Sequence, residues 1–312
     1  MKIAIIDLGT NTFNLLIFDA SANKILSSTK IAVKLGEGGI NNNFIEEAPF
    51  LRGLQALRDH LETAKQFKAD TLYAFATSAI RSATNGADFV QQAAQLGIHV
   101  NVIDGATEAE LIFKGVKQAI KIPEVPYLVM DIGGGSTEFI LAKGTETLWK
   151  KSYLLGCSRL LEKFTPSDPI AADEINMLED YFDEQLEDLV EVCRAHTPRL
   201  LVGSSGSFDT LAQMCALRFK TSALSETDTT YTFDLYEYMQ MAQLMIKSDI
   251  EERLNTPGMI PMRADMIVIA CLQINFIVKR LGIKSLSLST YALKEGVIAD
   301  VTENQHPWLK SY

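Results

Sequence analysis

Two stretches of this sequence join an aspartate at the end of an apolar run to a glycine-containing turn that is rich in hydroxyl groups. The first is Asp-Leu-Gly-Thr-Asn-Thr from Asp7, and the second is Asp-Ile-Gly-Gly-Gly-Ser-Thr-Glu from Asp131. Glycine lets backbone N–H groups approach an anion closely, hydroxyl groups add donors, and a carboxylate offers Mg²⁺ a hard oxygen ligand. The chemistry that such a turn suits is therefore the binding of phosphate and metal.

The simplest alternative is that each turn is only a tight hairpin bend. A strand-like apolar run follows each turn, at residues 15–18 and 139–141, whereas a helix follows the glycine-rich loop of dinucleotide-binding folds. Neither turn contains the Gly-Lys-Ser/Thr of a P-loop. Two copies in a chain of 312 residues indicate an internal duplication. The pair favours phosphate binding more strongly than either turn does alone.

The elements that must position these turns follow an α/β pattern, in which apolar β-rich runs predict strands and a three-and-four spacing predicts helices. The predicted strands are residues 3–7, 15–18, 71–76, 99–103, 128–131, 139–141, 200–202 and 284–288. The predicted helices are residues 51–67, 87–96, 175–192 and 263–280, with another beginning near Thr107. The polar segment 220–230 is predicted to be a mobile loop. Pro123 and Pro126 precede the second turn, so we expect domains of residues 1–124 and 125–312.

The composition is that of an ordinary globular protein. Hydrophobic residues make up 47% and charged residues 22%, which excludes disordered chains and disulfide scaffolds. No run approaches the roughly 18 apolar residues of a membrane span. A net charge of −10 argues against nucleic acid or an anionic membrane as partner, since both bind basic surfaces. The four cysteines form no C-x-x-C pair, which fits a cytoplasmic protein without structural zinc.

The two turns resemble the phosphate motifs of the exopolyphosphatase/guanosine-pentaphosphate phosphatase (Ppx/GppA) family. Further stretches match motifs of that family in the same order, at residues 34–38, 76–81, 105–111, 155–160, 202–206, 263–265 and 293–296. The resemblance thus covers nearly the whole chain. It implies an α/β fold of two actin-like (ribonuclease H-like) domains, each with a mixed sheet, which meet at an interdomain cleft lined by the two turns.

The resemblance also implies roles for acidic residues. Glu108 matches the catalytic glutamate of the family, which orients and deprotonates the attacking water, although Thr107 replaces the first of the two acids usual there. Without the resemblance, Glu108 would be interpreted as an acid that complements a helix dipole. Glu138 is implied as a second catalytic carboxylate, and Asp7, Asp131 and Glu138 as the metal-side carboxylates. The implied cofactor is Mg²⁺, or Mn²⁺ in its place.

The phosphate-binding residues that the resemblance implies are Gly9, Thr10, Asn11, Thr12, Arg81, Gly133, Gly134, Gly135, Ser136 and Thr137. We expect Arg81 in a polar loop after the strand at 71–76, where a lone arginine would otherwise be interpreted as a solvated surface residue. The secondary candidates are Lys34, Gly203, Ser204 and Arg263. Asn14 departs from the family, because relatives commonly have a basic residue there, and this chain lacks that charge.

The function implied by the resemblance is Mg²⁺-dependent release of the terminal phosphate from inorganic polyphosphate, from guanosine pentaphosphate (a nucleotide of the stringent response), or from both. Two alternatives stay open, namely an ATP-dependent kinase or ATPase of the same fold and a non-catalytic polyphosphate- or alarmone-binding regulator. Many relatives are homodimers, so a second copy is a further candidate partner. Some longer relatives carry a C-terminal helical domain, which we expect to be absent because this chain ends at Tyr312 soon after the last motif.

Overall fold

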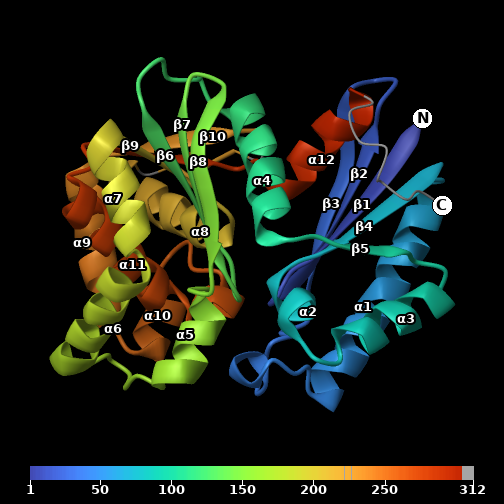
Figure 1. Cartoon of the computed structure of the whole chain (residues 1–312), viewed down its shortest axis with the longest axis horizontal. Helices are drawn as coiled ribbons and strands as arrows, with labels where there is room; N and C mark the ends of the chain where they lie inside the picture. The colour runs from blue at the N-terminus through green and yellow to red at the C-terminus, as the bar shows by residue number, and fades with distance from the viewer. Residues whose placement is uncertain (221, 226, 304–312) are drawn as a thin grey trace. The chain divides into compact units, whose positions relative to one another are not determined.

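The computed structural model describes residues 1–220, 222–225 and 227–303 (Figure 1). Residues 221 and 226 of the predicted mobile loop, and the end of the chain at Tyr312, lie outside the described residues. The chain divides into two compact units, one formed by residues 1–115 with the segment from Leu293 onward and the other by residues 116–292. The expected division at residue 124 differs from this one, chiefly because the last helix belongs to the first unit.

That helix, α12 (Leu293–Thr302), packs against α4 (Gly105–Ala119) of the first unit. A Cβ at Gly296 would overlap the carbonyl of Leu111, so only glycine allows the two backbones to approach this closely. The Lys114 ammonium lies 2.5 Å from the buried carboxylate of Asp300. A tight backbone contact and an ion pair together hold the late segment on the early one.

The sheet of the first unit has the strand order β3-β2-β1-β4-β5. Its strands are β1 (Lys2–Leu8), β2 (Thr12–Asp19), β3 (Lys24–Ala32), β4 (Thr71–Ala76) and β5 (Val100–Val102). The first three strands are antiparallel neighbours, whereas β4 and β5 run parallel to β1. Helices α1 (Glu47–Gln66) and α3 (Gly86–Gln95) lie on one face of the sheet, and α4 and α12 lie on the other (Figure 1). Because both faces are covered, β1 has consecutive apolar residues instead of an alternating pattern.

The second unit repeats this topology. Its sheet has the order β10-β11-β9-β6-β7-β8, in which the last five strands, taken in reverse, repeat the antiparallel and parallel pairings of the first sheet. The strands are β6 (Tyr127–Ile132), β7 (Thr137–Lys143), β8 (Glu146–Tyr153), β9 (Leu200–Ser204), β10 (Thr230–Phe233) and β11 (Ser285–Ser289). The predicted duplication and the predicted α/β fold of two units, each with a mixed sheet, are thereby confirmed.

The helices of the second unit correct one prediction. The single helix predicted over residues 175–192 is wrong, because the chain forms α6 (Ala172–Gln185) and α7 (Glu187–His196), separated at Leu186. Leu186 has φ −108° and ψ 17°, outside the helical region. The bend keeps Leu178, Phe182 and Leu189 in the same buried core. A straight helix would carry part of this apolar stripe away from that core.

Short helices account for most of what the periodicity did not predict. They are α2 (Ser78–Ser82), α5 (Cys157–Phe164), α8 (Gly206–Cys215), α9 (Leu235–Lys247), α10 (Ile250–Leu254), the 3-10 turns Ile40–Asn42 and Pro261–Arg263, and the π-helical turn Ala216–Lys220. The apolar helix predicted from residue 263 is α11 (Ile267–Leu281). Among the described residues, none of these helices combines the length and apolarity needed to cross a bilayer.

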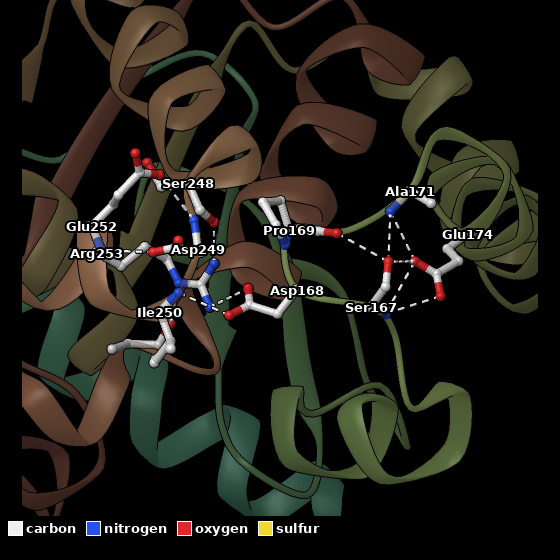
Figure 2. A network of polar contacts seen from close by, with 11 residues as sticks. Ser167, Asp168, Pro169, Ala171, Glu174, Ser248, Asp249, Ile250, Glu252 and Arg253 are labelled. Carbon is white, nitrogen blue, oxygen red and sulfur yellow. Dashed lines mark hydrogen bonds and ion pairs between the residues drawn. The ribbon is translucent and has the colours of Figure 1, made fainter.

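A network of polar contacts fixes the segment that precedes α11 (Figure 2). The buried guanidinium of Arg253 lies 2.7 Å from the Asp168 carboxylate and donates to the carbonyls of Ser248 and Ala264. The backbone N–H of Ile250 donates to the same aspartate at 2.8 Å. Arg253 thereby joins three separate segments of the second unit, one of which carries the neighbouring Arg263.

Candidate active site

The glycine turn of the first unit directs its carbonyl groups into the protein. The N–H of Gly9 donates to the Thr12 carbonyl at 3.1 Å and closes the turn. The Asn11 carbonyl accepts two backbone N–H groups, from Val33 and Lys34, both at 2.9 Å. Because the C=O and N–H of a trans peptide point in opposite directions, the N–H of Thr12, which follows the Asn11 carbonyl, points away from that segment. This is the orientation that anion binding requires.

The turn of the second unit has the same geometry. The N–H of Gly133 donates to the Ser136 carbonyl at 3.0 Å. The start of α5 donates to the turn, because the N–H of Cys157 reaches the Gly133 carbonyl at 3.0 Å and the N–H groups of Ser158 and Arg159 reach the Gly134 carbonyl. Helix α5 therefore fixes the turn from the carbonyl side.

Two buried carboxylates face each other beside this second turn. Asp131 and Glu138 are paired across β6 and β7, and their exposed fractions are 7% and 1%. Each accepts a hydroxyl, Asp131 from Ser204 at 2.6 Å and Glu138 from Ser152 at 2.7 Å. Like charges placed directly opposite on a sheet repel each other. The arrangement therefore favours a bound cation.

The equivalent pair in the first unit carries less negative charge. Asp7 lies opposite Asn14, whose side-chain amide donates to the Asp7 carboxylate at 3.0 Å. Burial raises the pKa of Asp7, whereas Lys294 and the Asn14 amide act in the opposite direction and Glu295 adds to the increase. Asn14 thus occupies the position that Glu138 occupies in the second unit, and it supplies a hydrogen-bond donor in place of a carboxylate.

Arg263 lies against the first residue of α8. A Cβ at Gly206 would overlap the Arg263 guanidinium, so any other residue there would displace that side chain. Burial lowers the pKa of Arg263, and Cys157, Asp209 and Asp131 counteract this effect. A guanidinium at the N-terminus of a helix, where the backbone is also positive, is suited to attract an anion.

Glu108 is a buried carboxylate in the first turn of α4, with 7% of its surface exposed. Its carboxylate lies 2.8 Å from the guanidinium of Arg81. The prediction that Arg81 lies in a loop is wrong, because the residues form the short helix α2. The interpretation of Glu108 as only a dipole-complementing surface acid does not account for this partner or for its burial.

The hydroxyl-bearing residues predicted to bind phosphate differ in their surroundings. Thr10, Thr12 and Ser136 are buried within the turns. The hydroxyl of Thr137 is fully buried and hydrogen-bonds the Leu155 carbonyl and the Gln273 side chain, so it serves the core and not the open side of the turn.

The secondary candidates Lys34, Gly203 and Ser204 also differ in their surroundings. The Lys34 side chain is exposed next to the first turn, at a residue with a positive φ of 48°. Gly203 has a packing role, because a Cβ there would overlap the ring of Phe208. Ser204 bonds the carboxylate of Asp131.

Sequence reasoning missed several residues that position these groups. Gly156 packs its backbone directly on Gly134, and Asp104 begins α4 by accepting the N–H of Thr107 at 2.7 Å. Glu110, on the same helix, pairs with Lys114 at 3.4 Å. Ser152 lies opposite Glu138 in the register of β7 and β8. Counting outward from the second turn would have identified this hydroxyl.

The candidate site residues are divided between the two units. Asp7, Arg81 and Glu108 belong to the first unit, whereas Asp131, Glu138 and Arg263 belong to the second. The expected cleft between the turns stays a prediction. Within the described residues, no three His, Cys, Asp or Glu side chains gather closely enough to form a complete metal centre.

Comparison with known proteins gives consistent matches over this architecture. The model of the Ppx/GppA phosphatase family matches residues 16–305. The crystal structure of an exopolyphosphatase from Cytophaga hutchinsonii is 39% identical, with a TM-score of 0.94, and the alignment covers 97% of this chain and 98% of that one. A Ppx/GppA family member from Aquifex aeolicus, at 24% identity and a TM-score of 0.78, has the same fold over 98% of this chain and 99% of that one.

Proposed function

Because the chain belongs to the Ppx/GppA phosphatase family, we propose that it is an exopolyphosphatase, which releases the terminal phosphate of inorganic polyphosphate by hydrolysis. The observation that carries the proposal is the duplicated glycine turn with buried carboxylates beside it, in a chain that resembles an exopolyphosphatase over nearly its whole length. Polyphosphate is a linear polyanion, and a glycine turn that presents backbone amides suits its phosphoryl groups.

In this proposal Glu108 accepts the proton of the attacking water and orients that water in line with the terminal phosphorus. Backbone amides of the turns that follow Asp7 and Asp131 donate to the non-bridging oxygens, where negative charge accumulates in the transition state. The guanidinium of Arg263 adds a half-buried positive charge at the start of α8. The bond from water oxygen to phosphorus forms as the anhydride bond breaks, and the products are inorganic phosphate and a polyphosphate one unit shorter.

The residues present fit a divalent cation in the second unit. Mg²⁺ is held by one or two carboxylates together with waters and substrate phosphates, and the buried pair of Asp131 and Glu138 is such a donor set. Bound there, Mg²⁺ or Mn²⁺ would neutralise phosphate charge. Asp7 is already hydrogen-bonded to Asn14 and lies near Lys294, so we assign the principal ligand role to the second unit.

The test is release of phosphate from short polyphosphate, long polyphosphate and guanosine pentaphosphate, each with Mg²⁺ and with EDTA. We expect turnover of polyphosphate that EDTA abolishes and that Glu108→Gln reduces by about 10²- to 10⁴-fold, the usual range for loss of a general base. Exposed Glu110→Gln, two positions along the same helix, is the matched control and keeps its activity.

Other results would assign another function. Turnover of guanosine pentaphosphate alone would make the nucleotide the substrate. Release of ADP from ATP would support the kinase or ATPase alternative, and tight polyphosphate binding without turnover would support a regulator. Full activity of Glu108→Gln would remove Glu108 from the mechanism.

A further inference from the structure

Arg81 and Glu108 reach each other from two connections at one edge of the first sheet. Arg81 is in α2, which follows β4. Thr77 lies between β4 and α2, and its N–H donates to the Leu8 carbonyl at the end of β1. Glu108 is in α4, which follows β5. Between β5 and α4, the N–H of Ile103 donates to the Ala76 carbonyl at the end of β4, at 3.1 Å. Parallel strands end at the same edge, so both side chains start from fixed positions.

A single nitrogen of the guanidinium makes both bonds that fix Arg81. Its Nη1 donates to the Ile103 carbonyl at 2.9 Å and to Oε2 of Glu108 at 2.8 Å. The side chains of Arg81 and Glu108 are 21% and 9% exposed, so water screens the pair weakly. The carbonyl cannot move independently of the sheet edge, and the guanidinium therefore transmits a fixed position to the carboxylate.

The charge around Arg81 is already balanced. Its guanidinium is bonded to Glu108 and also helps to lower the pKa of Asp104, whose main partner is the N–H of Thr107. One positive charge thus faces two carboxylates, while Glu110 on the same helix is directed to Lys114. A guanidinium neutralised in this way attracts a phosphate weakly.

We propose that Arg81 is a positioning residue that acts through Glu108: it holds the carboxylate in one orientation for the attacking water. This inference rests on the proposed function, in which Glu108 is the base. It replaces the phosphate contact expected for Arg81 from the sequence. A base held in place raises the rate of the chemical step, whereas a phosphate contact made equally by substrate and transition state lowers KM.

A double-mutant cycle on polyphosphate hydrolysis separates the two roles. We expect Arg81→Met to lower kcat by about 10- to 100-fold, the cost of a misplaced reacting group, with KM changed less than about twofold. Arg81→Lys keeps one donor and the charge, and should recover part of the rate. In the Glu108→Gln background, Arg81→Met should cost no further activity, because residues that act as a unit are not additive.

Arg280→Met is the matched control, because Arg280 forms an ion pair of the same 2.8 Å length with Asp183 on the exposed surface of the second unit. It should leave kcat unchanged. Circular dichroism checks that each variant is folded, and Arg81→Lys serves in the cycle if Arg81→Met unfolds.

Multiplicative losses in the double variant, or a raised KM with wild-type kcat, would overturn the positioning role while leaving the hydrolase intact. Absence of polyphosphate turnover by the wild-type protein would instead overturn the proposed function, and the inference with it.

Discussion

Replacing Gly156 by alanine should disable the second glycine turn, because the added methyl group would displace the backbone of Gly134 and Gly135. A Cβ on Gly156 would lie closer than 3.0 Å to two backbone atoms of Gly134 and to the nitrogen of Gly135. All three are backbone atoms, so no side chain can rotate to relieve the overlap. The turn and the start of α5 must separate by roughly 1 Å to restore ordinary contact.

The magnitude follows from what that separation breaks. Three N–H groups at the start of α5 donate to the carbonyls of Gly133 and Gly134 at 2.9–3.1 Å. At about 0.5–1.5 kcal/mol for each hydrogen bond, we expect the free energy of unfolding to fall by about 2–4 kcal/mol. Displacing the amides by this distance should lower kcat by about 100-fold, because preorganised donors must meet the phosphate within a fraction of an ångström.

The assay is phosphate release from polyphosphate at saturating substrate, with urea unfolding of the same protein. Gly97→Ala is the control, since Gly97 is exposed with φ +86° and has nothing within 4 Å of its Cβ position. Backbone strain should make that variant less stable by about 1–2 kcal/mol with wild-type kcat. A Gly156→Ala protein that lost stability but kept its kcat would refute the argument that α5 sets the turn.

Two further predictions concern charge. Glu138→Gln relieves the repulsion with Asp131, so the melting temperature of this variant in EDTA should rise by up to about 3 °C. Saturating MgCl2 should raise the melting temperature of the wild-type protein, and this increase should largely disappear in the variant. Equal MgCl2 shifts in both proteins would argue against this metal site. His60 is buried beside the Phe13 carbonyl at 3.1 Å, and burial lowers its pKa from 6.5. As the pH falls below 6.5 the unfolded chain therefore binds a proton that the folded protein does not, and stability declines. His60→Gln should remove this decline between about pH 7.5 and 5.5 in urea unfolding, and parallel stability curves for the two proteins would contradict the assignment.

Local pattern was sufficient for the turns and for the strands around them. Asp7 and Asp131 end apolar runs, and glycine follows two positions later in both. Because an antiparallel hairpin has a period of two, the positions opposite each aspartate are set by the turn. The register shows that Asn14 and Glu138 occupy equivalent places.

Local pattern failed where distant segments compete for one surface. The helix predicted through Leu186 is interrupted there, and residues on both sides of the break pack into one core. The expected placement of residues 293–312 in the second half missed α12, whose contact with Leu111 depends on Gly296, far along the chain. The hydroxyl of Thr137 resembled a phosphate donor by its place in the turn, yet Gln273 from a remote helix hydrogen-bonds it.

The amino-acid sequence by itself determined the duplicated turns, the acids beside them and the α/β alternation, since these depend on residue type and on spacing within a few positions. Tertiary structure alone decided which groups share a hydrogen bond or a charge. Arg81 and Glu108 are 27 positions apart, and Asp131 and Ser204 are 73 apart. Such partners meet only because parallel strands bring their ends to one edge, and no period in the sequence encodes that distance.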